Sequence, residues 1–341
     1  MYFHWGSTMG NNDKIFRYWA VVPAGFEEVA LEEMAQTLPG LRVDRQEKGR
    51  SQVKICFTYE RSPLRLLELR SVQALYALVV EVRGITVGKP GMLSLVKKIT
   101  GSDLKAAQRL AAVFDSDRSV DVCHVNATVQ GHHRFGVSDL VYRVHKALEG
   151  EYGLAIGAPS QGLLLQLQVR GRRAVLGMRL RTSQATQHHA TSFCIGRMLG
   201  LEPGDRILWL RRDPAEVAEL IQTFGVEVYS GTEDVRITLR RIPGHWFLWD
   251  GERVPVLDKE CSHLLATCKA GKELALVGEL ARILPVGCIG LVQVGRKEVM
   301  SALLADHESL EVAAVLPLGH RGRQQHLYAI ERVLTQDFLQ V

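Results

Sequence analysis

The chain has 341 residues, a length that predicts two or three domains, and its composition excludes disordered, fibrous and small disulfide-rich proteins. Apolar residues make up 46% and charged residues 23% of the chain, close to the averages for globular proteins. The net charge of +5 is unevenly divided: residues 1–181 carry 25 Lys and Arg against 17 Asp and Glu, and residues 182–341 carry 17 against 20. A basic half attracts polyanions, most commonly nucleic acid, although a solvated surface with a chance excess of cations is an open alternative.

The start of the chain and its cysteines indicate which compartment to expect. Residues 1–15 lack the basic and apolar regions of a secretory signal, so we expect an extension or tag there. The apolar stretch 275–295 contains Glu279, Arg282 and Pro285, which argues against a membrane-spanning helix. The six cysteines occur singly, without a CxxC pair, which favours free thiols over disulfides or a metal site. We therefore expect a cytoplasmic protein without a membrane partner.

The first two units are predicted to mix helices and strands, from the spacing of their apolar residues. In residues 16–89 we expect strands at 17–22, 41–45, 51–57 and 76–87, and helices at 27–38 and 62–76. In residues 90–181 we expect helices at 92–98, 103–113 and 138–149, and strands at 119–128, 162–169 and 174–180. Ser62 and Ser138 have the residue type and position of helix N-caps.

The third unit, residues 182–341, is predicted to alternate strands and helices. The strands are expected at 206–210, 226–229, 262–266, 288–294, 310–317 and 326–331, and the helices at 191–199, 214–224, 273–284 and 297–304. This alternation predicts a mostly parallel sheet, closed at one edge by an antiparallel pair formed by the last two strands.

Short sequences occurring in a fixed order point to a family. They are residues 20–27 and 30–33, the run His133-Arg134-Phe135 with 138–143, and residues 166–171 and 174–180. In this order they resemble the THUMP-domain RNA methyltransferases, most of all those that make N2-methylguanosine in tRNA. The resemblance covers residues 16–181 and implies a ferredoxin-like unit at 16–89 followed by a THUMP RNA-binding domain at 90–181.

The third unit resembles the same family in outline. Residues 188–191 stand where the family has the segment that opens the helix before its catalytic domain, and residues 203–208 resemble the strand that leads into the cofactor loop. The last strands and residues 319–322 between them are similar to the end of a seven-stranded methyltransferase sheet. The resemblance thus implies a Rossmann-like class I methyltransferase fold for residues 182–341.

The cofactor loop of that fold is not recognisable in the sequence. The family pattern is Asp-Pro-x-x-Gly-x-Gly, but no glycine occurs between Ile207 and Phe224. Side chains in place of glycines would obstruct the approach of S-adenosylmethionine, and Arg211 and Arg212 would oppose its sulfonium charge. Asp213-Pro214 is better explained as the start of a helix.

The acceptor motif is missing as well. Methyltransferases of amino groups use Asn/Asp-Pro-Pro-Tyr/Phe loops, whereas residues 267–272 read Thr-Cys-Lys-Ala-Gly-Lys. No Asn or Asp is present there to orient the amine of the base, and no aromatic residue is present to stack on the base. Glu227 and Asp234 are candidates for holding a cofactor ribose by position alone, and solvated surface acids are the alternative. The sequence therefore predicts a degenerate methyltransferase domain with no catalytic residue and no cofactor.

The candidate RNA-binding residues belong mainly to the second unit. They are Arg134, Arg143, Lys146, Arg170, Arg172 and Arg173, with Lys97 and Lys98 as outliers. In the family that the sequence resembles, this module binds the single-stranded acceptor end of tRNA. Phe135 or Tyr142 could stack on a base, although we expect both in the core, and His133 is a weaker candidate.

Other constellations have ordinary explanations. The histidine pairs at 132–133 and 188–189, with His124 and His145, lack cysteines at ligand spacing, so no zinc site is expected. The turn at 319–323 could contact phosphate or be a solvated hairpin tip.

Three hypotheses remain after this reading. The first is a pseudoenzyme that binds RNA, most of all tRNA. The second is an active tRNA guanosine methyltransferase that uses S-adenosylmethionine. The third is an assembly subunit that associates with itself or with a catalytic protein partner.

Overall fold

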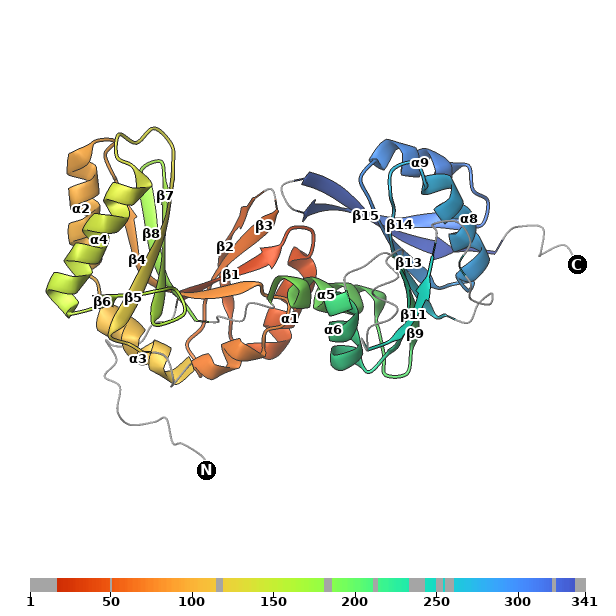
Figure 1. The fold of residues 1–341 in the computed structure, drawn as a ribbon, viewed down its shortest axis with the longest axis horizontal. Helices are drawn as coiled ribbons and strands as arrows, with labels where there is room; N and C mark the ends of the chain where they lie inside the picture. The colour runs from red at the N-terminus through yellow and green to blue at the C-terminus, as the bar shows by residue number, and fades with distance from the viewer. Residues whose placement is uncertain are drawn as a thin grey trace, which may run out of the picture.

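A computed structural model describes residues 17–49, 51–114, 119–180, 186–210, 214–232, 243–249, 254, 261–320 and 323–334. The molecule is elongated and consists of two bodies side by side, each built on one β-sheet (Figure 1). No helix in the described ranges is long and apolar enough to cross a membrane.

The first body contains an eight-stranded sheet in the order β2-β3-β1-β4-β8-β7-β5-β6. Its strands are β1 (Arg17–Pro23), β2 (Arg42–Lys48), β3 (Gln52–Thr58), β4 (Ala74–Arg83), β5 (Val122–Gln130), β6 (Ala155–Ile156), β7 (Leu163–Arg170) and β8 (Arg173–Arg179). The strands expected in the first and second units thus share one sheet, because β4 pairs antiparallel with both β1 and β8.

Helices cover one face of this sheet. They are α1 (Glu27–Thr37), the 3₁₀-helix η1 (Pro63–Glu68), α2 (Lys89–Thr100), α3 (Leu104–Phe114) and α4 (Val137–Tyr152). In β7, Leu163, Leu165, Leu167 and Val169 point into this core, which follows from their alternation with polar residues. The opposite face carries a small cluster formed by Trp19, Cys56 and Val175.

Two local predictions in this body were wrong. The helix expected at 62–76 is limited to η1, because the carboxylate of Glu33 accepts hydrogen bonds from the backbone N–H groups of Arg70 (2.7 Å) and Ser71 (2.9 Å). The buried Glu33 therefore fixes a non-helical backbone there. The expected cap Ser138 lies inside the first turn of α4, since the N-cap residue is Gly136.

The second body contains a seven-stranded sheet in the order β11-β10-β9-β12-β13-β15-β14. Its strands are β9 (Arg206–Leu210), β10 (Glu227–Thr232), β11 (His245–Leu248), β12 (His263–Thr267), β13 (Ile289–Val294), β14 (Leu310–His320) and β15 (Arg323–Arg332). The first five are parallel, and β15 is antiparallel to both β13 and β14, as the sequence predicts. Its described helices are α5 (Thr186–Leu199), α6 (Pro214–Phe224), α8 (Glu273–Ile283) and α9 (Lys297–Ala305).

The two bodies contact each other mainly through α5, which packs against α1 and β1. Arg197 on α5 donates a hydrogen bond to Gln36 on α1 at 3.1 Å. Gly25, with φ +95°, lies against β14, where an added Cβ would come within 2.6 Å of the carbonyl oxygen of Pro317. Glycine is required there by both the backbone conformation and the close approach.

Candidate nucleic-acid interface

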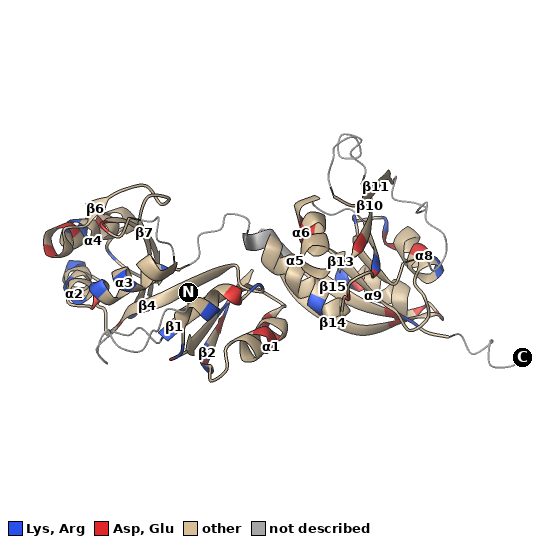
Figure 2. Ribbon diagram, turned by 90° about the horizontal axis from the view of Figure 1, so that it is seen from below, with Lys and Arg blue, Asp and Glu red and all other residues tan. Residues whose placement is uncertain are grey.

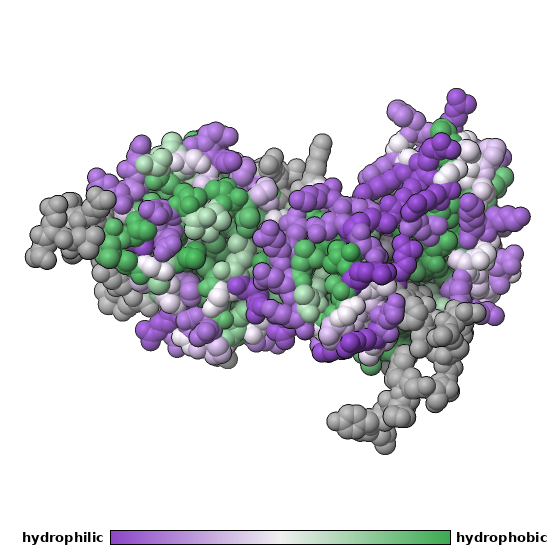
Figure 3. Space-filling view, turned by 180° about the vertical axis from the view of Figure 1, so that it is seen from behind, coloured by the Kyte–Doolittle hydropathy of each residue, from purple (hydrophilic) through white to green (hydrophobic). Residues whose placement is uncertain are grey.

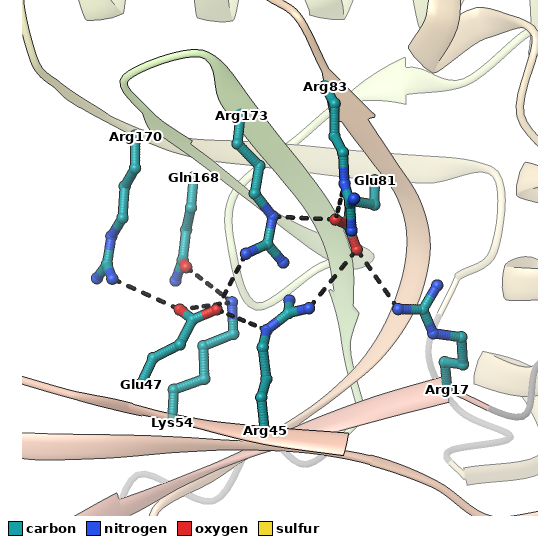
Figure 4. Close-up of polar contacts among 9 residues, drawn as sticks. All are labelled: Arg17, Arg45, Glu47, Lys54, Glu81, Arg83, Gln168, Arg170 and Arg173. Atoms are coloured by element: carbon teal, nitrogen blue, oxygen red, sulfur yellow. Dashed lines mark hydrogen bonds and ion pairs between the residues drawn. The ribbon is translucent and has the colours of Figure 1, made fainter.

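The uncovered face of the first sheet is curled. A flat sheet with strands about 4.8 Å apart would separate β2 from β7 by roughly 24 Å, since four strands lie between them. Glu47 on β2 nevertheless lies 3.5 Å from Arg170 on β7, and Lys54 on β3 donates a hydrogen bond to Gln168 on β7 at 3.1 Å. The sheet therefore bends until its β2–β3 hairpin faces its β7–β8 hairpin, as Figure 4 shows.

A network of charges joins the two hairpins. Arg173 lies 3.4 Å from Glu47 and 3.0 Å from Glu81. Further ion pairs to these two carboxylates come from Arg17, Arg45, Lys54, Arg83 and Arg170 (Figure 4). Among the described residues, six cations thus share two carboxylates, which leaves an excess of four positive charges inside the curl. Such a surface attracts anions.

The electrostatics of this network follow from its burial. Burial would raise the pKa of Glu81, but the hydrogen bond from Arg83 and the charge of Arg45 outweigh it and hold that pKa below its usual range. Burial lowers the pKa of Lys54, and the nearby Glu47 opposes this effect. The Nζ of Lys54 also lies 4.2 Å from the ring centroid of Trp19, a cation–π contact.

Three loops meet at one end of the sheet, and we call residues 84–88, 131–136 and 170–173 together the basic end. The carbonyl oxygen of Val87 accepts the N–H of Arg134 at 2.9 Å, and that of Arg172 accepts the N–H of Ile85 at 3.0 Å. The side chains of Arg134 and Arg172 are exposed. Both α2 and α4 begin here, so the positive ends of two helix dipoles face the same region.

The other predicted residues lie on the outer surface of α2 and α4, two neighbouring helices that run in the same direction (Figure 1). Lys97, Lys98 and Lys146 are exposed, and each lies eight or nine residues, about 12–14 Å, from the first residue of its helix. Arg143 forms an ion pair with Asp139 at 2.9 Å. Figure 2 shows Lys and Arg side by side on this part of the first body.

The structure thus brings the predicted residues to two places. Arg134, Arg170, Arg172 and Arg173 gather at the basic end, and the remaining four lie along the helices. Arg170 and Arg173 already have carboxylate partners, which sequence reasoning missed because Glu47 and Glu81 are distant along the chain.

The aromatic and histidine candidates differ from one another in burial. Phe135 is buried, as expected, but the expectation that Tyr142 lies in the core was wrong. Tyr142 is 59% exposed, and the Nζ of Lys146 lies 5.6 Å from its ring centroid. His133 packs on Phe135 with ring centroids 4.8 Å apart. Within the described ranges, no group of His, Cys, Asp and Glu could hold a metal ion.

The cofactor site of an α/β sheet is expected at the carboxyl ends of its parallel strands. Residues 211–213, the first part of the expected cofactor loop at 211–217, and Asp234 lie outside the described residues. Helix α6 begins at Pro214, as predicted. Glu227 is the first residue of β10 and lies 3.3 Å from Arg206, so it stands at the opposite edge of the sheet and cannot hold a cofactor ribose there.

The described residues at the cofactor edge form a packed apolar cluster. Leu210, Trp249 and Val254 are buried in one core cluster. A Cβ on Gly231 of β10 would lie 2.8 Å from Leu210 and 3.0 Å from Phe247, so the face of the sheet beside this glycine is closely packed. S-adenosylmethionine carries an amino acid, a sulfonium and a ribose. Leu210, Trp249 and Val254 offer these polar groups no charged side chain.

The loop at the acceptor position, residues 268–272, follows β12. An ion pair of Glu273, the residue directly after this loop, holds the loop in place. Arg296 donates two hydrogen bonds to Glu273, at 3.0 and 2.9 Å, and Glu273 accepts the N–H of Gly271 at 2.7 Å. Burial would raise the pKa of Glu273, but backbone hydrogen bonds and Arg296 hold it below its usual range. Glu273 thus serves to position the loop.

Solved structures with the same fold cover nearly the whole chain. TrmN from Thermus thermophilus has a TM-score of 0.70 and 18% identity, over 93% of this chain and 100% of that one. A "possible methylase" from Clostridium difficile 630 has a TM-score of 0.65 and 8% identity, over 94% and 98%. The protein SMU.472, solved in complex with S-adenosylhomocysteine, has a TM-score of 0.61 and 10% identity, again over 94% and 98%.

Comparisons of the sequence with protein families and curated proteins identify no relative of the chain. No protein-family model matches the chain, and no curated protein matches it. At these identities the structural likeness establishes the fold alone: the chain has a mixed α/β architecture whose second body is a Rossmann-like methyltransferase fold.

Proposed function

We propose that this chain is an RNA-binding protein of the THUMP type, with tRNA as its RNA, whose methyltransferase-like body has lost its cofactor and acceptor sites. The observation that carries the proposal is the charge of the first body. Two carboxylates are shared by six cations inside the curl, and exposed Arg134 and Arg172 lie at the adjoining basic end. Phosphate groups of RNA provide the negative charge that this surface lacks.

The second body contributes a scaffold in this proposal. Its sheet has the five parallel strands and the antiparallel edge pair that the sequence predicts, and Leu210, Trp249 and Val254 are packed together where a cofactor would lie. A folded domain without a cofactor site can brace the RNA-binding body, or dock on a catalytic partner or on a second copy of the chain.

An active tRNA guanosine methyltransferase is the second candidate. The observation in its favour is the fold shared with SMU.472, with a TM-score of 0.61, since that structure contains S-adenosylhomocysteine. This candidate requires a working cofactor loop at 211–217 and at the residues after β10.

The proposal is tested by measuring the binding of bulk tRNA to the full chain as a function of salt, with fluorescence anisotropy. The double variant Arg134→Gln/Arg172→Gln removes two exposed cations without breaking an ion pair that joins the hairpins. Because each phosphate contact contributes about 0.7–0.9 to the slope of log K against log salt, we expect the loss of two contacts to reduce the magnitude of the slope by roughly 1.4–1.8.

The control is Arg42→Gln, which removes another exposed arginine, at the start of β2 on the first strand of the same sheet. Arg173 is avoided because its loss would leave the partly buried Glu81 with one partner fewer. The proposal is wrong if tRNA binding is independent of salt, or if the double variant and Arg42→Gln change the slope equally.

A further inference from the structure

One edge of the first sheet is completed by side chains where its last strand ends. Strand β5 pairs with β7 over most of its length, but within the described part of the chain its other side pairs with β6 at Val122 and Cys123 alone. On that side the carbonyl oxygen of Cys123 accepts the N–H of Gly157 at 3.1 Å. Because alternate residues of a parallel strand face the same neighbour, the next backbone group on this side is the N–H of Val125, beyond the end of β6.

The imidazole of His145 takes the place of the missing strand. His145 belongs to α4, which packs on β5 (Figure 1), and it is 9% exposed. Its Nε2 accepts the N–H of Val125 at 2.9 Å. An imidazole nitrogen accepts a hydrogen bond only when it carries no proton, so this ring is neutral and has its proton on Nδ1. One hydrogen bond thus fixes both the charge and the tautomer of His145.

A second imidazole lies beside the first. The ring centroid of His124, on β5, is 6.2 Å from that of His145, and the Nδ1 of His124 lies 3.2 Å from the carbonyl oxygen of Gly157. A carbonyl oxygen only accepts hydrogen bonds, so the Nδ1 of His124 is the donor. A ring that donates from Nδ1 keeps this bond when its Nε2 takes up a proton. The two histidines therefore differ in their response to acid, since only His145 loses its partner.

Protonation of His145 would turn its Nε2 into a donor that faces another donor. The N–H of Val125 cannot accept a hydrogen bond, so both groups would be left buried without a partner. The imidazolium would also lie next to the ring of His124. Burial, and after it the charge of His124, lower the pKa of His145 below its ordinary value.

The other ionisable groups around His145 do not offset this effect. Burial raises the pKa of the Cys123 thiol on β5 to about 11, so this thiol is uncharged in acid. Strand β6 has no ionisable side chain, and the lysines of α2 at 89, 97 and 98 are exposed. On α4, Glu149 lies one turn after His145 and is exposed, and the hydroxyl of Tyr152 donates to backbone carbonyl oxygens. Water screens the exposed charges.

We propose that His145 is an acid-sensitive switch that controls the contact between α4 and the edge of β5. The neutral ring holds α4 on the strand through the N–H of Val125, and protonation releases this contact and opens the edge. Helix α4 carries Arg143 and Lys146 and begins at the basic end, so the switch controls how firmly these cations are held in place. The inference stands on the hydrogen bonding of one ring and does not depend on the proposed binding of tRNA.

The test is amide hydrogen exchange of the full chain, followed by NMR at a series of pH values. Because the folded chain binds this proton less readily than the unfolded chain, opening should begin as the pH falls below about 6.5, the ordinary pKa of histidine. After division by the intrinsic exchange rate at each pH, the N–H of Val125 should exchange about 10-fold faster in acid, as expected for the loss of one buried hydrogen bond.

Three variants separate the switch from a general effect of acid. His145→Gln supplies an amide oxygen that accepts the N–H of Val125 but does not titrate, so the acid response should disappear. His124→Asn keeps a donor for the carbonyl oxygen of Gly157, and it should retain the response and shift it to higher pH because a neighbouring charge is removed. The matched control is His132→Gln, which removes an exposed histidine from the loop after β5 and should behave as the wild type.

The nitrogen chemical shifts of the imidazole rings test the tautomer in the wild-type chain. An unprotonated Nε2 of His145 at neutral pH supports the switch, and a protonated one would overturn it. Exchange at Val125 that is independent of pH after the correction, or an acid response that persists in His145→Gln, would overturn it as well. If His145→Gln does not fold, the ring shifts and the exchange of the wild type still decide. All these results leave the salt-dependent binding of tRNA untouched.

Discussion

The contact between Gly177 and Trp19 offers a sharp test of the curled sheet. An alanine Cβ at position 177 would lie 1.9 Å from Cη2 and 2.4 Å from Cζ3 of the Trp19 ring. The ring has nowhere to move, because it is stacked on Tyr76 and covered by the Nζ of Lys54 at 4.2 Å from its centroid. Gly177→Ala should therefore overpack the inside of the curl.

The magnitude follows from the balance of two effects. Overpacking a close-packed site costs about 1–3 kcal/mol, and the short contacts here involve a ring that is held on all sides, which favours the upper end. Replacing glycine in a strand stabilises by about 0.5–1 kcal/mol where no clash occurs. We expect a net loss of about 2 kcal/mol in the free energy of unfolding of the first body.

The assay is urea unfolding followed by circular dichroism, for Gly177→Ala, Trp19→Phe and the double variant. A phenylalanine ring lacks the outer edge that meets the new methyl group, so the double variant should lose at least about 1 kcal/mol less than the sum of the single losses. Gly150→Ala in α4 is the control, since nothing lies within 4 Å of its Cβ, and it should stabilise by about 1 kcal/mol. A neutral Gly177→Ala, or additive effects in the double variant, would refute the packing described here.

Two further predictions concern the pH dependence of stability at Glu81 and the binding of S-adenosylmethionine. The pKa of Glu81 is lower in the folded chain than in the unfolded chain, so its contribution to stability is present above the unfolded pKa near 4.3 and is lost as pH falls through the folded value. The difference in unfolding free energy between wild type and Glu81→Gln should thus be largest near neutral pH and shrink below about pH 4. The control variant Glu68→Gln, at an exposed position, should have nearly the unfolding free energy of the wild type at every pH. A difference for Glu81→Gln that does not change with pH would contradict the lowered pKa of Glu81. Equilibrium dialysis with S-adenosylmethionine, with and without bulk tRNA, should give no saturable micromolar binding; saturable binding would place the methyltransferase candidate first.

Much of the fold could be predicted because local patterns determine it. The alternation of Leu165, Leu167 and Val169 with two glutamines predicts the buried face of β7, and Pro214 marks the start of α6. The antiparallel pair β14–β15 at the sheet edge also follows from two apolar strands at the end of the chain. Each of these features depends on residues that are close together in sequence.

One error arose where a distant residue decides the local structure. Residues 70 and 71 turn away from a helix because Glu33, 37 and 38 positions earlier, accepts their N–H groups. The error at Tyr142 has a local cause. Tyr142 is exposed because it lies two residues from both Leu140 and Val144, which are buried, and therefore occupies the opposite side of α4.

The interior of the curl could not be predicted for a related reason. The residues of the charge network come from β1, β2, β3, β4, β7 and β8, and a cavity beside it, with several glutamines in its lining, is formed by nearly the same strands. Which glutamines face one another depends on the bend of the sheet. No pattern within a single segment of the sequence predicts that bend. The sequence identified Arg170 and Arg173 as cations but not their carboxylate partners.

The loss of the cofactor site that we propose is compatible with the retention of the second body. The core of that body lies between its helices and its sheet, so filling the carboxyl edge with Leu210 and Trp249 leaves the core intact and adds apolar contacts. The body also supports its neighbour, because Phe193 and Cys194 of α5 belong to the same core cluster as Met34 of α1. Removing the second body would expose part of the first body's core to water. The RNA-binding half that we propose would thus depend on a methyltransferase fold for its stability even where no methyl group is transferred.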